Sequence, residues 1–287
     1  MTSLDKKSPN MLVKLFLSSG MLLLVATLTS FNTQHFSLPT AKSIQQAMAK
    51  VNDSLFVCKY EVSNSEYREF LGSLKIKEAS SAEKYQIDST KWENGPMAKY
   101  YHVHPAYANY PVVNISYEAA LAYCEWLTGQ YNSDAKRKFG KVKFFLPSED
   151  TWMEVASGGN KSKMYPWSNY YLRNRNGQSL CNYRHLGDES ITYNKATKEY
   201  KIVPEFHNIA LGLNDVSIYT ASVNSFEAVA PYNVHNMSGN VAEMVSEKGI
   251  AKGGSYNSPG YDVRIQSKMN YTDASPEVGF RVFMKIE

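Results

Sequence analysis

Apolar residues recur at helical spacing in three stretches of the first half of the chain. Each stretch begins directly after polar or proline residues that commonly start a helix. The predicted helices are one capped by Ser63 and Glu66 that reaches Leu74, one capped by Ser116 that reaches Leu127, and one opened by Pro147 and Ser148 that covers residues 149–156.

After Gly158 the pattern changes to short apolar pieces separated by turns rich in Gly, Asn, Ser and Tyr. Such pieces predict short strands in a largely irregular backbone. The strand candidates are Ile202–Val203, Val223, Ala251–Tyr256, Val263–Lys268 and Val278–Lys285. Helices followed by short strands, with no internal repeat, predict a single α+β body over residues 55–287.

The N-terminus carries a strongly apolar run. Lys6 and Lys7 precede residues 11–30, in which Lys14 is the only charge. This pattern predicts export, with residues 1–31 as a signal peptide or an N-terminal membrane anchor and residues 32–54 as a linker. The apolar stretch is near the short end of the roughly 17–25 residues that span a bilayer, so both forms stay open. A weak cleavage signature slightly favours the uncleaved anchor.

Composition narrows the partners of this body. The formal net charge is +4, and no Lys/Arg run exceeds residues 136–138, so we expect no nucleic-acid partner. Twenty-one tyrosines suit a surface that binds through amphipathic rings. Three cysteines allow at most one disulfide, and Cys124 lies in a helical pattern that predicts a buried thiol.

Few residues carry recognisable chemistry. His102 and His104 are two positions apart but have no evident third ligand, so we interpret them as surface or loop histidines. In the segment from Asn236 to Glu243, side-chain oxygens bracket a glycine and could form the oxygen shell that calcium requires. A turn followed by the start of a helix would produce the same spacing.

Seven short blocks occur in a fixed order between residues 56 and 287. They are Val62–Leu71, Tyr110–Leu127, Phe145–Trp152, Tyr165–Trp167, Asn236–Glu243, Gly253–Tyr256 and Gly279–Arg281. In this order they resemble the formylglycine-generating-enzyme family, also called the sulfatase-modifying-factor domain. The resemblance implies a variant of the C-type-lectin fold with little regular secondary structure and frequently bound calcium.

The resemblance also implies two calcium sites. The first would use the side chains of Asn236 and Glu243 with the carbonyls of Gly239 and Val241. The second would use the side chains of Asn182 and Asp215 with the carbonyls of Tyr183 and Ser217, across an unusual insertion. The alternative is that both loops close through their own hydrogen bonds without metal.

This sequence departs from the family at the reactive positions. The family's two copper-binding cysteines fall on Ser258 and Val263, and neither side chain is a soft thiolate ligand. We therefore expect no copper and no formylglycine generation. Two tryptophans of the family signature are replaced by Ala242 and Met244, so packing there must differ. Arg281 is expected to make a structural ion pair or carbonyl contacts.

Three functions follow as expectations. The first is a non-catalytic pseudoenzyme of the periplasm or cell envelope that binds an envelope protein. It would resemble gliding-motility and type IX secretion components, and would contact the inner membrane through residues 11–31 if uncleaved. The second is a lectin-like protein that binds a glycan or another ligand. The third is an enzyme with altered oxidoreductase chemistry.

Different residues would carry the second and third functions. A lectin-like site would use Tyr256, Asn257, Ser258, Tyr261 and Asp262, whereas altered catalysis would draw on Ser258, Asp262, Arg264 and His235. A closed, apolar region beneath the turn of residues 253–255 would favour binding or structure, and convergent polar groups around a cavity would favour catalysis.

Overall fold

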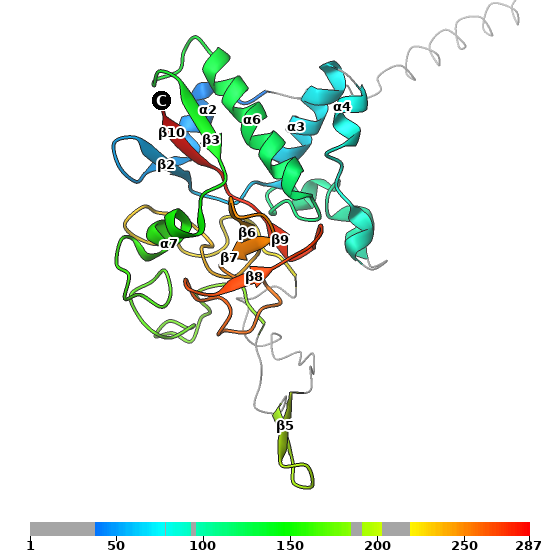
Figure 1. The fold of residues 1–287 in the computed structure, drawn as a ribbon, viewed down its shortest axis with the longest axis vertical. Coiled ribbons are helices and arrows are strands. Elements are labelled where there is room, and N and C mark those ends of the chain that lie inside the picture. The colour runs from blue at the N-terminus through cyan, green and yellow to red at the C-terminus, as the bar shows by residue number, and fades with distance from the viewer. Residues whose placement is uncertain (1–37, 78, 93–95, 185–190, 203–218) are drawn as a thin grey trace, which may run out of the picture. The chain divides into compact units, whose positions relative to one another are not determined.

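The computed structural model describes residues 38–77, 79–92, 96–184, 191–202 and 219–287 (Figure 1). Residues 38–287 form one compact unit. The predicted apolar helix within residues 1–31 lies outside the described residues. Among the helices that are described, none has the length and apolar character needed to cross a membrane.

The three helices predicted from the sequence are present, and two are longer than expected. Ser63 and Glu66 form the capping box of α3: the Ser63 backbone nitrogen donates to Glu66 Oε2 (2.8 Å), and the Glu66 backbone nitrogen donates to Ser63 Oγ (3.3 Å). The described helices are α2 (Ala41–Ala47), α3 (Asn64–Lys77), α4 (Ala79–Glu83), α5 (Pro96–Tyr100), α6 (Tyr117–Ser133) and α7 (Glu149–Ser157), with short 3-10 turns at Ser89–Trp92 and Pro105–Tyr107.

One four-stranded sheet joins the two ends of the described chain. Its strands are β1 (Met48–Lys50), β2 (Leu55–Cys58), β10 (Phe283–Ile286) and β3 (Val142–Phe145), in the order β1-β2-β10-β3 and all antiparallel. In β10, Phe283 pairs with Val57 on one side and with Phe145 on the other. Helix α6 packs on β3 (Figure 1), so this sheet and the helices share the main hydrophobic core.

A second four-stranded sheet holds the signature segment. Its strands are β8 (Lys268–Asn270), β7 (Ile250–Lys252), β6 (Ala242–Met244) and β9 (Val278–Gly279), in the order β8-β7-β6-β9, with β6 and β9 parallel. Residues 280–282 connect β9 to β10 of the first sheet. Arg281 therefore lies at the junction of the two sheets.

The strand predictions are only partly confirmed. Val223 and Val263 are buried, as their apolar side chains suggested, but they lie in irregular backbone. Burial of a side chain does not by itself place its residue in a hydrogen-bonded β-strand. A hairpin of β4 (Ile191–Asn194) and β5 (Glu199–Ile202) occupies part of the insertion that follows Asn182.

The described part of the expected linker belongs to the folded body. Ala41 and Ile44 of α2 are buried in the main core, and β1 pairs along β2. The Ala41 backbone nitrogen donates to Asp134 Oδ2 at 2.8 Å, which ties the start of α2 to the end of α6. The packed unit thus already includes Leu38, well before the expected start at Leu55.

Candidate functional site

A buried ion pair lies where the two sheets meet. Arg281 and Glu243 are 0% and 1% exposed, and Arg281 Nη2 donates to Glu243 Oε1 at 2.6 Å. The same guanidinium donates to the carbonyls of Cys58 (2.9 Å) and His235 (2.6 Å). Burial alone would lower the pKa of Arg281, but the Glu243 carboxylate raises it overall. The expected structural role of Arg281 is therefore confirmed, with both the ion pair and the carbonyl contacts.

A second buried carboxylate, Glu61, was not predicted as part of this centre. It is 1% exposed and accepts hydrogen bonds from Asn240 Nδ2 (2.8 Å) and Asn236 Nδ2 (3.1 Å). Burial raises the pKa of Glu61 to about 7. The only sequence signal was an acidic residue just before the capping box, and its partners lie about 180 residues away along the chain.

The signature segment forms a tight loop that runs into strand β6 and not into a helix. Asn236, Gly239 and Asn240 all have positive φ (56°, 74° and 65°). A Cβ on Gly239 would lie 2.2 Å from the carbonyl oxygen of Asn182, so only glycine permits this approach. The Asn240 nitrogen donates to the same carbonyl (2.8 Å), so the loops of the two implied calcium sites lie against each other.

The side chains of the first implied calcium site differ in their fit to a cation. Asn236 Oδ1 is buried and has no hydrogen-bond partner among the described residues, which suits an oxygen ligand of a hard cation. Both oxygens of Glu243 instead accept from Arg281, and Oε2 also accepts from Trp152 Nε1 (2.7 Å). Glu243 therefore already serves as the counter-ion of an arginine, and only Asn236 fits the expected role without rearrangement.

The second implied calcium site is described only in part. Asn182 is fully buried, and its Nδ2 donates to the Tyr219 carbonyl at 2.7 Å. Tyr183 packs in a small cluster with Val263. Asp215 and Ser217 lie outside the described residues. In the part of the chain that is described, no group of three or more His, Cys, Asp or Glu side chains could hold a metal ion.

The two positions that the resemblance aligns with the family's copper-binding pair, Ser258 and Val263, are closely packed. Ser258 is 4% exposed, and its Oγ accepts from the Ser255 nitrogen (2.9 Å). Ser255 Oγ donates to Glu277 Oε2 at 2.6 Å, which ties the turn to the segment before β9. Val263 is fully buried in an apolar cluster with Tyr165. A hydroxyl and an isopropyl group do not fit a copper ion.

The region beneath the turn of residues 253–255 is filled. A Cβ on Gly253 would lie 2.9 Å from the Met237 carbonyl oxygen and 3.1 Å from the Trp152 ring. The turn therefore packs directly onto a fully buried tryptophan, the arrangement that favours binding or structure over catalysis.

The residues considered for altered catalysis do not form a network. His235 Nδ1 bonds to the Phe226 carbonyl (2.6 Å), and Arg264 lies over the Tyr261 ring, 3.3 Å from its centroid. Among the described residues, no hydrogen bond joins Ser258 to His235, Asp262 or Arg264. The pairing of nucleophile and base that covalent catalysis needs is absent from this set.

The three cysteines give no substitute nucleophile. Cys58, Cys124 and Cys181 are all buried and unpaired, as the helical pattern predicted for Cys124. Burial raises the pKa of the Cys58 thiol to about 12 and raises the pKa values of the other two as well. All three therefore stay in the unreactive thiol form at neutral pH.

The residues predicted for ligand binding divide between surface and interior. Tyr261 is 68% exposed, and Asn257 and Asp262 are also at the surface or near it. Ser258 is buried, and Tyr256 packs edge-on against Tyr219 with its backbone nitrogen bonded to the Asn240 carbonyl. The structure thus does not present all five residues as one binding surface.

His102 and His104 do not form a pair of exposed histidines. His102 is 6% exposed, with Nδ1 bonded to Asn64 Oδ1 (3.0 Å) and Nε2 accepting from Trp92 Nε1 (3.2 Å). Burial lowers the pKa of His102 to about 3, so the ring is neutral. His104 is exposed and caps the 3-10 turn that starts at Pro105. Both histidines lie in turns, as expected of surface or loop histidines, but only His104 is at the surface, and His102 is buried with specific partners.

The fold and this site define an α+β scaffold built around a buried arginine–carboxylate centre, with a serine and a valine at the two positions where the resemblance implies the family's cysteine pair. The chain belongs to the family of the sulfatase-modifying factor enzyme 1-like domain, which it matches over residues 30–286. The resemblance that the seven sequence blocks indicated is confirmed.

Curated relatives include both inactive and active members. The chain is 26% identical over 187 residues to inactive C-alpha-formylglycine-generating enzyme 2 of Bos taurus, covering 60% of this chain and 49% of that protein. It is 27% identical over 146 residues to the formylglycine-generating enzyme of Mus musculus, covering 41% of this chain and 34% of that protein. The matches thus span half or less of these relatives.

Solved structures support the fold. PvdO from Pseudomonas aeruginosa superposes with a TM-score of 0.51 at 17% identity, covering 80% of each chain. Treponema denticola variable protein 1 superposes with a TM-score of 0.50 at 14% identity, covering 83% of this chain and 91% of that one. At such identities the likeness shows the fold alone, and it confirms the predicted α+β class.

Proposed function

We propose that this chain is a non-catalytic member of its family that uses the scaffold to bind a partner in the cell envelope. The observation that carries the proposal is the filled reactive position: Val263 is fully buried among apolar side chains, and the Ser258 hydroxyl is held by Ser255. A fold that keeps its packing but loses its reactive atoms retains binding as its available function.

The names of two curated relatives agree with this proposal. The Bos taurus and Mus musculus proteins described as inactive match 60% and 58% of this chain, more than the 41% matched by the active mouse enzyme. We also propose that the protein is exported to the periplasm or cell envelope. Its role there would be like that of gliding-motility or type IX secretion components. The apolar run of residues 11–30 is the support for export.

The test is extraction of the tagged full-length protein in mild detergent with calcium present, followed by mass spectrometry of co-purifying proteins and of its own N-terminus. A near-stoichiometric envelope protein is the expected result, and an intact segment of residues 11–30 would identify the anchor. A solitary protein that begins near residue 31 would overturn the anchored-assembly proposal.

Loss of catalysis has a separate test. The protein is incubated with a cysteine-containing sulfatase peptide and copper, and the peptide mass is measured beside an active family member as a positive control. We expect no conversion of the cysteine to formylglycine. Conversion above the level of a Ser258→Ala variant would show that the chain is an enzyme.

We also propose calcium as a structural ligand of the loop from Asn236 to Glu243. The buried Asn236 Oδ1 without a partner supports it. The cation would hold a loop in which Asn236, Gly239 and Asn240 have positive φ. A melting temperature that neither calcium nor a chelator changes would count against this ligand.

The second candidate function is a lectin-like display of the loop of residues 256–262. The exposed Tyr261, over which Arg264 stacks, is the observation that favours it. Loss of partner or ligand binding in a Tyr261→Ala variant would identify this loop as the binding surface.

A further inference from the structure

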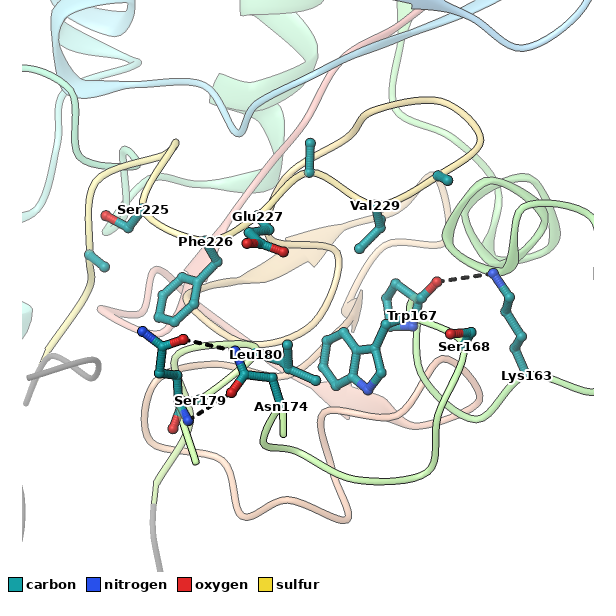
Figure 2. Close-up of a pocket in the computed structure, with 15 residues that line it drawn as sticks. Lys163, Trp167, Ser168, Asn174, Ser179, Leu180, Ser225, Phe226, Glu227 and Val229 are labelled. Atoms are coloured by element: carbon teal, nitrogen blue, oxygen red, sulfur yellow. Dashed lines mark hydrogen bonds between the residues drawn. The ribbon is translucent and has the colours of Figure 1, made fainter. Parts of the chain in front are cut away.

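A groove is lined by neither of positions 258 and 263 and by no residue of the loop of residues 256–262, although its Trp167 packs in the cluster that holds Val263. It has a volume of about 660 Å³ and is formed by three segments, residues 163–168, 174–180 and 221–230 (Figure 2). None of its lining residues belongs to the signature loop of residues 236–243. Its volume falls within the roughly 300–1,000 Å³ typical of sites for small ligands.

Trp167 gives the groove a fixed aromatic wall. Its ring stacks on Tyr165 with an interplanar angle of 8° and a centroid distance of 5.1 Å. Its Nε1 donates to the Tyr171 carbonyl at 2.8 Å, so the indole N–H is already used. With one face covered and its donor engaged, the half-buried indole offers a ligand only its remaining apolar surface. In Figure 2 the Phe226 ring lies on the other side of Leu180 from this indole.

The polar groups of the groove are ordered before any ligand arrives. Asn174 Nδ2 donates to Gln178 Oε1 (2.9 Å), and the Gln178 nitrogen donates to Asn174 Oδ1 (3.0 Å). Both contacts are drawn in Figure 2. The hydroxyls of Ser168 and Ser225 add exposed groups that can donate and accept. Such pre-ordered amides reduce the entropy lost on binding.

The charges of the groove balance. Lys163 is the cation of the lining, and its Nζ donates to the Pro166 carbonyl at 3.1 Å. Glu227 is the anion, on the opposite segment, and it is exposed. A site with one charge of each sign attracts neither a phosphate-rich ligand nor a polycation over distance. The groove is therefore best matched by an uncharged ligand that has both apolar and hydroxyl surfaces.

We propose that this groove binds a neutral saccharide, as a short oligosaccharide or the end of a longer glycan. A pyranose ring has one face of C–H groups that can pack on the free indole surface, and hydroxyls around its edge that can bond to amides, hydroxyls and Glu227. The inference rests on the proposed function of the chain as a binding protein, and it names the ligand class and the site.

The test measures binding of four neutral trisaccharides (cellotriose, maltotriose, mannotriose and triacetylchitotriose) to the full-length protein in mild detergent, by ligand-observed NMR and calorimetry. Sialyllactose serves as an anionic comparator. The variants are Trp167→Leu, Phe226→Ala and Glu227→Gln, with Tyr100→Ala as a control on an exposed aromatic side chain that does not line the groove. Each variant is first compared with the wild type in melting temperature.

We expect at least one neutral trisaccharide to bind with a Kd of about 10 mM or tighter. Trp167→Leu should weaken it at least about tenfold, and Phe226→Ala and Glu227→Gln at least about threefold each, whereas Tyr100→Ala should change it less than about twofold. If Trp167→Leu lowers the melting temperature, its loss of binding could come from unfolding. The test then relies on Glu227→Gln and Phe226→Ala, because these two side chains contribute little to the buried core.

Three results would overturn the inference. They are no binding of any neutral trisaccharide, preference for sialyllactose, and binding that the groove variants leave unchanged. If sugar binding fails but an envelope protein co-purifies, the saccharide site is refuted and the proposed binding function stands. If a trisaccharide binds through Trp167 but no protein co-purifies, the saccharide site stands and the assembly role fails.

Discussion

Replacing Glu243 by Gln tests whether the buried ion pair holds the two sheets together. The substitution keeps the shape of the side chain but removes the charge that faces Arg281, which is 0% exposed. A buried charge that loses its partner typically costs about 3–5 kcal/mol of folding free energy. Glu61 also favours the charged form of Arg281, so we expect a loss near the lower end, about 3 kcal/mol.

The assay is urea unfolding of the purified wild type, Glu243→Gln, Arg281→Met and the double variant. Their unfolding free energies are compared when all four show the same dependence on urea concentration (the m value). Removing the arginine from the Glu243→Gln background also removes the uncompensated charge. We therefore expect the double variant to be more stable than the sum of the two single losses predicts, by about 1–3 kcal/mol.

A surface ion pair serves as the matched control. Glu118 pairs with Lys248 at side chains that are 58% and 66% exposed, so Glu118→Gln should cost less than about 1 kcal/mol. The reasoning is refuted if Glu243→Gln costs no more than this control, or if the losses of the two single variants simply add.

Three further changes test other parts of the site. His102 has a pKa of about 3 in the folded protein, below the unfolded value of about 6.5, so the unfolded state takes up a proton first and stability falls as pH drops below about 6.5. Between pH 7 and pH 4.5 the unfolding free energy of the wild type should fall by about 2–3 kcal/mol more than that of His102→Gln. An equal fall in the two proteins would contradict the prediction. Gly239→Ala should cost more than about 2 kcal/mol by urea unfolding, because its Cβ would lie 2.2 Å from the Asn182 carbonyl oxygen; a loss below about 1 kcal/mol would mean that the two loops can separate. Calcium should raise the melting temperature of the wild type but not that of Asn236→Ala, and an equal rise in both would place the cation elsewhere.

The helices could be predicted because their signals are local. Ser116 accepts from the Ala119 nitrogen (3.1 Å) and Ser148 from the Thr151 nitrogen (3.2 Å), so each cap and its helix lie within a few residues. Apolar spacing then fixes the face that packs. The C-terminal end of α6 was placed too early, because its last turns hold few apolar residues and are secured by packing on β3.

The strands could not be placed as well, because their partners are distant in sequence. Strand β10 is short and lies between β2 and β3, which precede it by more than a hundred residues. Val263 looked like strand because it is apolar, yet its burial comes from Tyr165 and Cys181 in irregular backbone. A period of two is not readable in strands of two to four residues.

Part of the site could not be predicted for the same reason, because Glu61 and its partners are far apart in the sequence. Glu61 became recognisable only with Asn236 and Asn240 beside it, and those contacts join positions that are 175 and 179 residues apart in the sequence. The lack of a metal ligand at Val263, by contrast, could be predicted from the sequence, because the resemblance aligns this position with a copper-binding cysteine and an isopropyl group has no donor atom for a metal.

The residues of the family signature and the residues at positions 258 and 263 carry different information about function. The most recognisable segment, from Asn236 to Glu243, supplies the side chains that bond to Glu61 and Arg281. Those contacts join the signature loop and β6 to the segment after β2 and to residues 280–282 between β9 and β10, so they stabilise the fold whether or not the protein is catalytic. A sequence can therefore keep the signature because the fold requires it. At positions such as 258 and 263 a cysteine is needed for the reaction but not for the fold. Only such positions distinguish an enzyme from a binding protein on the same scaffold.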